Sequence, residues 1–343
     1  MRFVLLLAAV IALGGCAGTK LLALESAQEK VWPSAPNKAR FRYVGELTGE
    51  NNFKAKHKPS GIGKTLKWLL TGLVGKSKPQ QLSRPQSGVV DHLGRIYVSD
   101  VNRAAVVVFD TIKGRMHVWE WATGTQRFRA PIGLAIYENR LYVADSELGY
   151  VAILDIRDGE PFGQIKKGLT RPTGIAIDYD DKRVFVADSR EHAVKVYDIN
   201  GKGLQSIGGY GEQDGKFNGP TYVAYAADRL YVADTLNARI QIFDRDGKFL
   251  LRFGQRGRRV GQFSRPKGIA VDRFGLIYVV ESLYDHLLVF DQKGRFLLPI
   301  GGEGSGVGQF YLPAGVWVDE KAQVYIADMF NGRIVVLQYL EGA

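Results

Sequence analysis

Acidic residues and histidines are the side chains in this sequence that could serve acid–base or metal chemistry. Six acids end apolar runs at nearly constant spacing: Asp100, Asp145, Asp188, Asp234, Glu281 and Asp328. The intervals are 45, 43, 46, 47 and 47 residues, so the acids belong to a repeat. We interpret them as structural, because a carboxylate can bond the local backbone where a strand turns.

The histidines do not form a recognisable catalytic or metal site. His57 and His117 fall in a linker and an outer strand, and His92 falls in a turn. His192 and His286 lie in matching loops of the third and fifth repeats, but two isolated histidines do not make a zinc set. Ser, His and Asp residues are not grouped for nucleophilic catalysis. We therefore expect no catalytic residue, no metal and no cofactor.

The repeat itself predicts the fold. Each unit opens with a proline and a small residue, and three short apolar runs follow, ending in Asp, Ala-Asp and Phe-Asp. The opening prolines are Pro85, Pro131, Pro172, Pro220, Pro266 and Pro313. A period near 46 residues with several short β-branched runs is typical of a β-propeller with one four-stranded blade per repeat. Six units over residues 82–343 predict an all-β, six-bladed propeller.

The units resemble NHL repeats, and the resemblance covers residues 82–338. It is closest in Gly268-Ile-Ala-Val-Asp and Tyr278-Val-Val-Glu of the fifth unit. Bulky or unusual residues depart from the pattern at Tyr137, Tyr222, Ala226 and Trp317, and we expect them to pack in the channel or between blades, or to touch a ligand. Six-bladed enzymes similar to this family hold His, Glu or Asn on their innermost strands around a metal. The innermost strands expected here carry neither His nor Glu.

The last repeat has only three strands before the chain reaches Ala343. Residues 40–53 match the fourth strand and exit loop of blade four, so we expect them to complete blade six and close the ring. Closure would satisfy an open strand edge in a chain whose single cysteine excludes an internal disulfide. Residues 16–39 before this strand, with the Trp-Pro-Ser-Ala-Pro stretch from Trp32, predict a stiff tether.

Residues 1–15 have the pattern of a signal peptide. Arg2 precedes an eleven-residue apolar run that is too short to span a bilayer as a helix. Leu13-Gly14-Gly15-Cys16 resembles the lipobox of bacterial lipoproteins, which implies that Cys16 is lipidated and becomes the mature N-terminus. Ala17 after the cysteine, rather than Asp, implies export to the outer membrane. We expect a cell-envelope protein attached to the membrane through Cys16.

Between the closing strand and the first blade lies a basic linker, residues 54–81. With Arg84, this stretch holds eight Lys or Arg residues and no acid. One helical face would carry Ile62, Leu66, Leu69, Leu70 and Leu73, with Trp68 beside them. Such a short amphipathic helix could pack on the propeller, lie on an anionic membrane or bind a partner protein. The residues alone leave these three alternatives open.

The net charge of +11 favours an acidic partner. In propellers, the loops that lead into the first strands and the turns between second and third strands share one face, here named the arginine face. Its expected cations are Arg84, Arg129, Arg171, Arg265, Lys267, Arg103, Arg190, Arg239 and Arg333. We expect a non-enzymatic scaffold that binds an acidic envelope protein or an anionic glycan or lipid head group, and no nucleic acid. The alternative is a lyase- or lactonase-like envelope enzyme with its active site in the channel.

The substitution Cys16→Ala tests the anchor. We expect the variant to lose incorporation of radiolabelled palmitate and to leave the membrane fraction, because the thiol is the acylated group and acyl chains supply the attachment. Ser83→Ala is a control that changes a distant small residue. Equal labelling of the Cys16→Ala variant and the wild type would contradict lipidation at Cys16.

Overall fold

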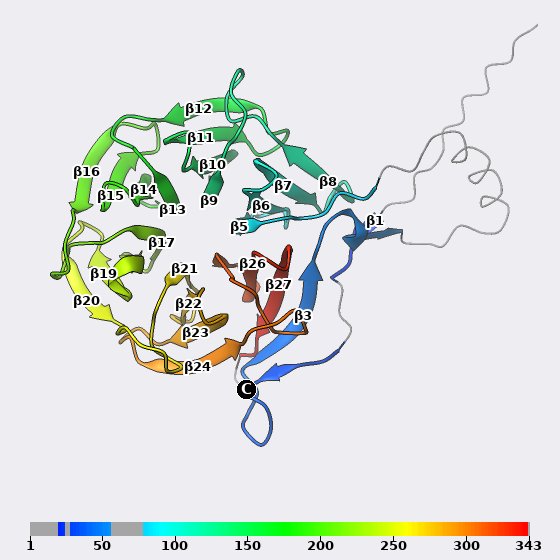
Figure 1. Cartoon of the computed structure of the whole chain (residues 1–343). Helices are drawn as coiled ribbons and strands as arrows, with labels where there is room; N and C mark the ends of the chain where they lie inside the picture. The colour runs from blue at the N-terminus through cyan, green and yellow to red at the C-terminus, as the bar shows by residue number, and fades with distance from the viewer. Residues whose placement is uncertain (1–19, 25–27, 56–77, 342–343) are drawn as a thin grey trace, which may run out of the picture.

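The computed structural model describes residues 20–24, 28–55 and 78–341. Six antiparallel sheets stand around a central axis (Figure 1). In blades one to five, four consecutive strands follow one another from the axis outward. The chain is therefore a six-bladed β-propeller, as the repeat predicts. The signal peptide with Cys16 and the predicted helix at residues 62–74 lie outside the described residues.

The strands of blades one to five follow the repeat. Blade one contains β5 (Pro85–Val90), β6 (Ile96–Asp100), β7 (Ala105–Asp110) and β8 (Arg115–Trp119). Blade two contains β9 (Pro131–Tyr137), β10 (Arg140–Asp145), β11 (Tyr150–Asp155) and β12 (Pro161–Ile165). Blade three contains β13 (Pro172–Asp178), β14 (Arg183–Asp188), β15 (Ala193–Asp198) and β16 (Gly203–Gly208). Blade four contains β17 (Pro220–Ala226), β18 (Arg229–Asp234), β19 (Arg239–Asp244) and β20 (Phe249–Phe253). Blade five contains β21 (Pro266–Val271), β22 (Ile277–Glu281), β23 (His286–Phe290) and β24 (Phe296–Gly301).

Blade six joins the two ends of the chain. Its inner strands are β25 (Val316–Val318), β26 (Gln323–Asp328) and β27 (Arg333–Tyr339), and β3 (Phe41–Leu47) pairs antiparallel with β27. The N-terminal strand thus supplies the outer part of this blade, over a shorter stretch than residues 40–53. The rest of that stretch forms η1 (Glu50–Asn52) and the start of β4 (Phe53–Ala55), which pairs with β1 (Lys20–Leu22).

The stretch expected to be a tether, residues 16–39, contains a short strand that the sequence pattern did not predict. β2 (Val31–Trp32) pairs with β3 and makes blade six a five-stranded sheet. Trp32 pairs with Phe41 across the two strands and is buried in the cluster between blades five and six. The hydrophobic effect of burying an indole outweighs the preference of the following prolines for an extended, unpaired chain.

The core lies between neighbouring blades rather than inside any one sheet. The second and third strands are buried on both faces, as in β6 and β7, which explains their continuous apolar runs. Buried tyrosines add hydrogen bonds across the gap between blades. The hydroxyl of Tyr97 donates to the carbonyl of Ile156 (3.0 Å), and that of Tyr142 donates to the carbonyl of Ile199 (3.1 Å). These bonds join blade one to blade two and blade two to blade three.

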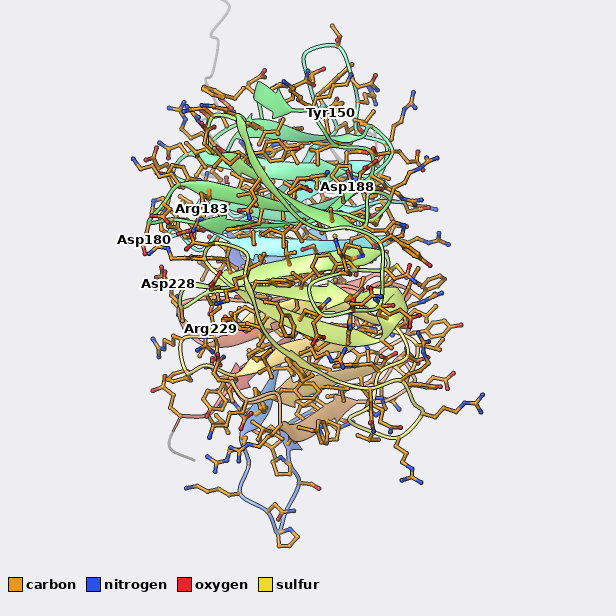
Figure 2. The ribbon with its side chains drawn as sticks, turned by 90° about the vertical axis from the view of Figure 1, so that its left-hand side faces the viewer. Tyr150, Asp180, Arg183, Asp188, Asp228 and Arg229 are labelled. Carbon is orange, nitrogen blue, oxygen red and sulfur yellow. The ribbon has the colours of Figure 1, made fainter. Side chains whose placement is uncertain are left out.

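Helical structure is nearly absent from the described part of the chain, where η1 and η2 (Thr235–Asn237) are single 3-10 turns. No helix among the described residues is long and apolar enough to cross a membrane. Figure 2 shows the propeller edge-on, with Asp188 and Tyr150 toward the arginine face on the right and Asp180 and Asp228 on the opposite face. The strands therefore separate the loops of the arginine face from the loops of the opposite face.

Candidate functional site

The acid that ends each second strand organises the arginine face. Asp145 is fully buried, and its carboxylate accepts backbone N–H groups from Arg129 (2.8 Å) and Ala130 (3.1 Å) in the loop that leads into the blade. It also accepts N–H groups from Glu147 (3.1 Å) and Leu148 (3.0 Å) in the following turn. One carboxylate thus joins two loops of the same blade. This geometry supports a structural role for the repeated acids.

The same arrangement recurs in the blades that carry the predicted arginines. Asp100 accepts the N–H of Arg84 (3.0 Å), Asp188 that of Arg171 (3.1 Å) and Glu281 that of Arg265 (2.9 Å). Burial raises the pKa of the Glu281 carboxyl, and the backbone donors act against that rise. The backbone of each arginine is therefore held in place, while its guanidinium extends from a fixed point.

Arg239 and Arg333 were expected at the binding surface, and the structure places them in the framework instead. Nε of Arg239 lies 2.7 Å from the Asp234 carboxylate, and Nε of Arg333 lies 2.8 Å from that of Asp328. Both arginines are buried, and both donate further bonds to backbone carbonyls of the loop leading into their blades. Arg333 also pairs with Glu46 of β3 at 2.7 Å. The positive charges of Arg239 and Arg333 are therefore neutralised by carboxylates of the protein itself.

The remaining predicted cations have different environments. Arg103 donates to the carbonyl of Gln81 (2.8 Å), so its side chain is also committed to the framework. Of the predicted cations, five are exposed arginines that form no ion pair with a carboxylate among the residues that the structure describes: Arg84, Arg129, Arg171, Arg190 and Arg265. The guanidinium of Arg84 lies over the ring of Phe330, 5.0 Å from its centroid. These arginines are available to an anion.

Lys267 is the second residue of β21 and lies one residue beyond the proline that follows Arg265. Its side chain is half-buried, and no carboxylate partner is found for it in the described part of the chain. Burial lowers the pKa of the Lys267 amine, and the positive charge of Arg265 lowers it further. A lysine that loses part of its hydration without gaining a counter-ion destabilises the folded chain.

His192 and Asp285 were not recognised as equivalent residues from the sequence. Both occupy the same left-handed position of the turn, with φ of 51° and 58°. Nδ1 of His192 accepts the N–H of Gly219 (2.9 Å), and Asp285 accepts that of Leu312 (2.6 Å). Each side chain reaches the leading loop of the next blade. His192 and His286 therefore differ by one position, and His192 serves a blade-to-blade contact.

The channel is obstructed near the arginine face. Tyr222 belongs to blade four and is buried, and its hydroxyl donates to the carbonyl of Gln86 in blade one, 3.0 Å away. Because blades one and four are opposite each other in a ring of six, the phenol crosses the channel. Trp317 stacks on Tyr325 at 5.5 Å between blades six and one, and its ring occupies the space that a side chain at Gly88 would need.

The space left in the channel is about 190 Å³ and is lined mainly by aliphatic and aromatic residues of the innermost strands. Tyr222 therefore packs inside the channel, and Trp317 packs at the interface between blades six and one. Among the described residues, no three His, Cys, Asp or Glu side chains are grouped in a way that could hold a metal ion.

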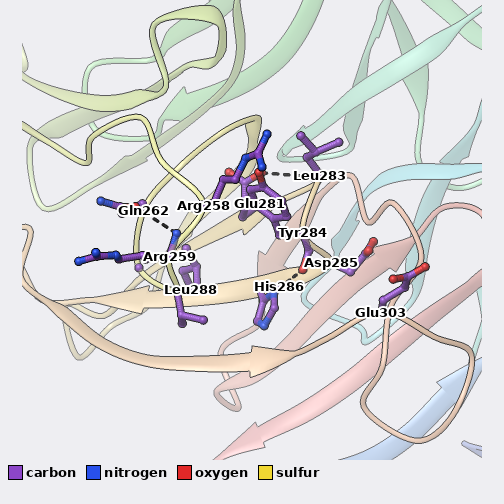
Figure 3. Close-up of a pocket in the computed structure, with 12 residues that line it drawn as sticks. Arg258, Arg259, Gln262, Glu281, Leu283, Tyr284, Asp285, His286, Leu288 and Glu303 are labelled. Carbon is purple, nitrogen blue, oxygen red and sulfur yellow. Dashed lines mark hydrogen bonds between the residues drawn. The ribbon is translucent and has the colours of Figure 1, made fainter.

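A small pocket opens on the arginine face beside blade five (Figure 3). Its volume is about 270 Å³. Arg258, Arg259 and Val260 line it from the loop that leads into blade five, and Leu283 and His286 line it from the turn of the same blade. The carboxylate of Glu281 in this pocket already accepts backbone N–H groups, so it is not a free acid.

Comparison with known families agrees with this architecture. Residues 213–282 and 275–340 match a model described as a 6-bladed beta-propeller, and residues 169–197 match the NHL repeat. No curated protein is similar enough in sequence to match.

Solved structures with the same fold differ widely in sequence. A structural genomics protein of unknown function from Bacteroides thetaiotaomicron has 14% identity and a TM-score of 0.60, over 75% of this chain and 70% of that one. An auxiliary nutrient binding protein from the same organism has 13% identity and a TM-score of 0.60, over 76% and 70% of the two chains. A catalytically inactive virginiamycin B lyase from Staphylococcus aureus has 12% identity and a TM-score of 0.56, over 91% and 99%. These similarities show the fold alone.

We expect Lys267→Met to raise the melting temperature by a few degrees at neutral pH, because it removes a half-buried charge that has no counter-ion among the described residues. The pKa of Lys267 is lower in the folded chain than in the unfolded chain. The destabilisation is therefore fully present below the folded pKa and fades as pH rises toward the unfolded value of about 10.4. Thermal unfolding from about pH 6 to about pH 10 measures this trend.

Lys202→Met is the matched control, since Lys202 is exposed on the opposite face. It should leave the melting temperature nearly unchanged at every pH. A Lys267→Met variant that melts with the wild type, or whose advantage grows with pH, would show that the Lys267 ammonium is solvated.

Proposed function

Because this chain is a six-bladed β-propeller in which residues 169–197 match the NHL repeat, we propose that it is a non-enzymatic scaffold that binds an anionic partner on its arginine face. The observation that carries the proposal is the contrast between two sets of arginines. Arg239 and Arg333 are buried against acids, whereas Arg84, Arg171 and Arg265 are exposed without them. Exposed cations that the fold does not neutralise remain free to attract an anionic partner.

The exposed arginines also lie where their electrostatic fields add. Arg84, Arg171 and Arg265 precede the opening prolines of blades one, three and five, so they are spread around one mouth of the channel. Low-dielectric walls weaken solvent screening between them, and their fields add near the axis. Lys267 adds a fourth charge at the beginning of β21. A carboxylate, sulfate or phosphate group would be attracted to this mouth.

A channel enzyme is the alternative class, and the lyases of the same fold make it reasonable by analogy. The geometry favours binding over catalysis, since Tyr222 crosses the channel and the remaining volume is small and mainly apolar. A nutrient binding protein among the similar structures shows that this fold also serves binding. Fold similarity alone does not assign either function.

The proposal includes a location. We propose that the propeller is attached through Cys16 to a membrane of the bacterial envelope, with export to the outer membrane, and the apolar segment and lipobox-like pattern of residues 3–16 support this proposal. Anionic glycans, lipid head groups and acidic envelope proteins are the partners that such a location offers. The arginine face would then act at the membrane–periplasm boundary, where net positive charge assists capture.

Reversing two of the arginines tests the proposal. We expect Arg171→Glu with Arg265→Glu to weaken binding of poly-L-glutamate at least roughly tenfold, because attraction becomes repulsion at the mouth. Binding by the wild type should also weaken as salt rises, since the Debye length falls from about 10 Å at 0.1 M to about 3 Å at 1 M. Fluorescence anisotropy with labelled polymer over a salt series measures both effects.

Lys202→Glu with Lys248→Glu is the charge-matched control on the opposite face, where both lysines are exposed in turns. It should bind the polymer about as well as the wild type. Equal loss in both double variants would mean that net charge, not the arginine face, governs binding. Salt-independent binding by the wild type would also overturn the proposal.

A further inference from the structure

The arginine face is not chemically uniform, and one turn position shows the division. In every blade, the residue two places after the second-strand acid lies in the turn between the second and third strands. In blades four, five and six this residue is Leu236, Leu283 or Phe330, with exposed fractions of 53%, 45% and 44%. In blades one, two and three it is Asn102, Glu147 or Arg190. Equivalent backbone positions thus present apolar side chains on one half of the ring only.

The loops leading into the same three blades add to this apolar half. Each contains an exposed apolar residue: Tyr210 (73%), Val260 (57%) or Tyr311 (45%). Each loop is also fastened by a buried phenylalanine, namely Phe217, Phe263 or Phe310. Bonds such as Phe217 N–H to the Gly209 carbonyl (2.9 Å) fix their backbones. The apolar side chains therefore project from ordered loops, which lowers the entropic cost of binding.

Cations are interleaved with these side chains. Phe330 lies between the guanidinium of Arg84 and the ring of Tyr311, which it meets edge-on at 5.5 Å. Val260 and Leu283 share the pocket of Figure 3 with Arg258 and Arg259. The stretch that supplies these two arginines has no acid between residues 249 and 271. Glu303 brings an exposed carboxylate to the same pocket from the loop that leads into blade six, and the Asp285 carboxylate there already accepts the N–H of Leu312. Aromatic and arginine residues at close quarters are enriched where proteins bind other proteins.

A partner of this surface must offer anions to the arginines and apolar groups to the exposed apolar side chains. A glycan or a lipid head group offers anions and hydroxyls, but it would leave Leu236, Leu283 and Phe330 in water. A polypeptide that is acidic and carries apolar side chains can neutralise the arginines and also cover the apolar residues. The pocket of about 270 Å³ is smaller than the 300–1,000 Å³ or so that is typical of small-molecule sites, and it suits one side chain.

On the basis of the proposed function, we infer that the partner is an acidic polypeptide that inserts an apolar or aromatic side chain between Val260 and Leu283. Its carboxylates lie against Arg258 and Arg259, in the loop that leads into blade five. The inference assigns the kind of partner, which the charge of the face alone does not.

Two synthetic polymers separate the inference from the proposed function. Poly-L-glutamate supplies carboxylates alone, and a glutamate–tyrosine copolymer of matched length supplies carboxylates with aromatic anchors. We expect the wild type to bind the copolymer at least roughly tenfold more tightly, a gain equivalent to about 1.4 kcal/mol, and to retain more of that binding at high salt. Heparin, an anionic glycan, should bind less tightly than the copolymer.

The double variant Val260→Ser with Leu283→Ser should bind poly-L-glutamate as the wild type does and lose the additional affinity for the copolymer. Leu93→Ser with Ile112→Ser is the matched control, because both residues are exposed in turns of the opposite face (50% and 54%). It should retain the additional affinity. Circular dichroism and melting temperatures check that each variant is folded.

The outcomes are distinct. Poly-L-glutamate binding with no gain for the copolymer would overturn the inference and leave the proposed function standing. Tighter binding of heparin, unaffected by the apolar variants, would overturn it in favour of a glycan. Failure of every anionic probe to bind would overturn both the inference and the proposed function.

Discussion

The buried carboxylate at the end of each second strand is the interaction on which the structure depends. It accepts backbone N–H groups from the loop before the blade and from the turn after it, as Asp145 and Asp188 do. Loops have few backbone partners of their own, so without this acceptor several N–H groups would be buried unpaired. Each repeat of about 46 residues therefore contributes one such carboxylate, which holds the loop and the turn of its own blade.

That constraint explains why similar arginines have different roles. In blades one, three and five, the carboxylate fixes the backbone of the arginine before the proline and leaves the guanidinium exposed. In blades four and six, Arg239 and Arg333 begin the third strand and turn back to the carboxylate itself. The N–H groups thus displaced, at Gly219 and Leu312, are satisfied by His192 and Asp285 of the preceding blade. The preceding blade thus supplies the acceptors that the carboxylates of blades four and six no longer provide.

Much of this architecture can be predicted from the sequence, because period and turn chemistry are local. The six blades, their opening prolines and the structural role of the acids all follow from spacing. Whether an individual arginine is exposed or paired with an acid does not follow from spacing, because it depends on which groups its side chain contacts in the folded chain. One signal was present: Asp234 and Asp328 are each followed by Asn at the third position and Arg at the fifth, a pattern that the other blades lack. The apolar half of the arginine face and the strand at Val31–Trp32 required the packing of distant segments.

Hydrogen exchange of the loop amides tests this account most directly. If the carboxylates hold the arginine-bearing loops, the amide protons of Arg84, Arg171 and Arg265 should exchange slowly, at rates close to those of buried strand amides such as Val143. The amide of Arg258, which lies in the loop leading into blade five and donates no backbone bond in the described structure, should exchange much faster. Exchange at Arg84, Arg171 and Arg265 as fast as at Arg258 would contradict the account, because the arginine face would then have no fixed framework.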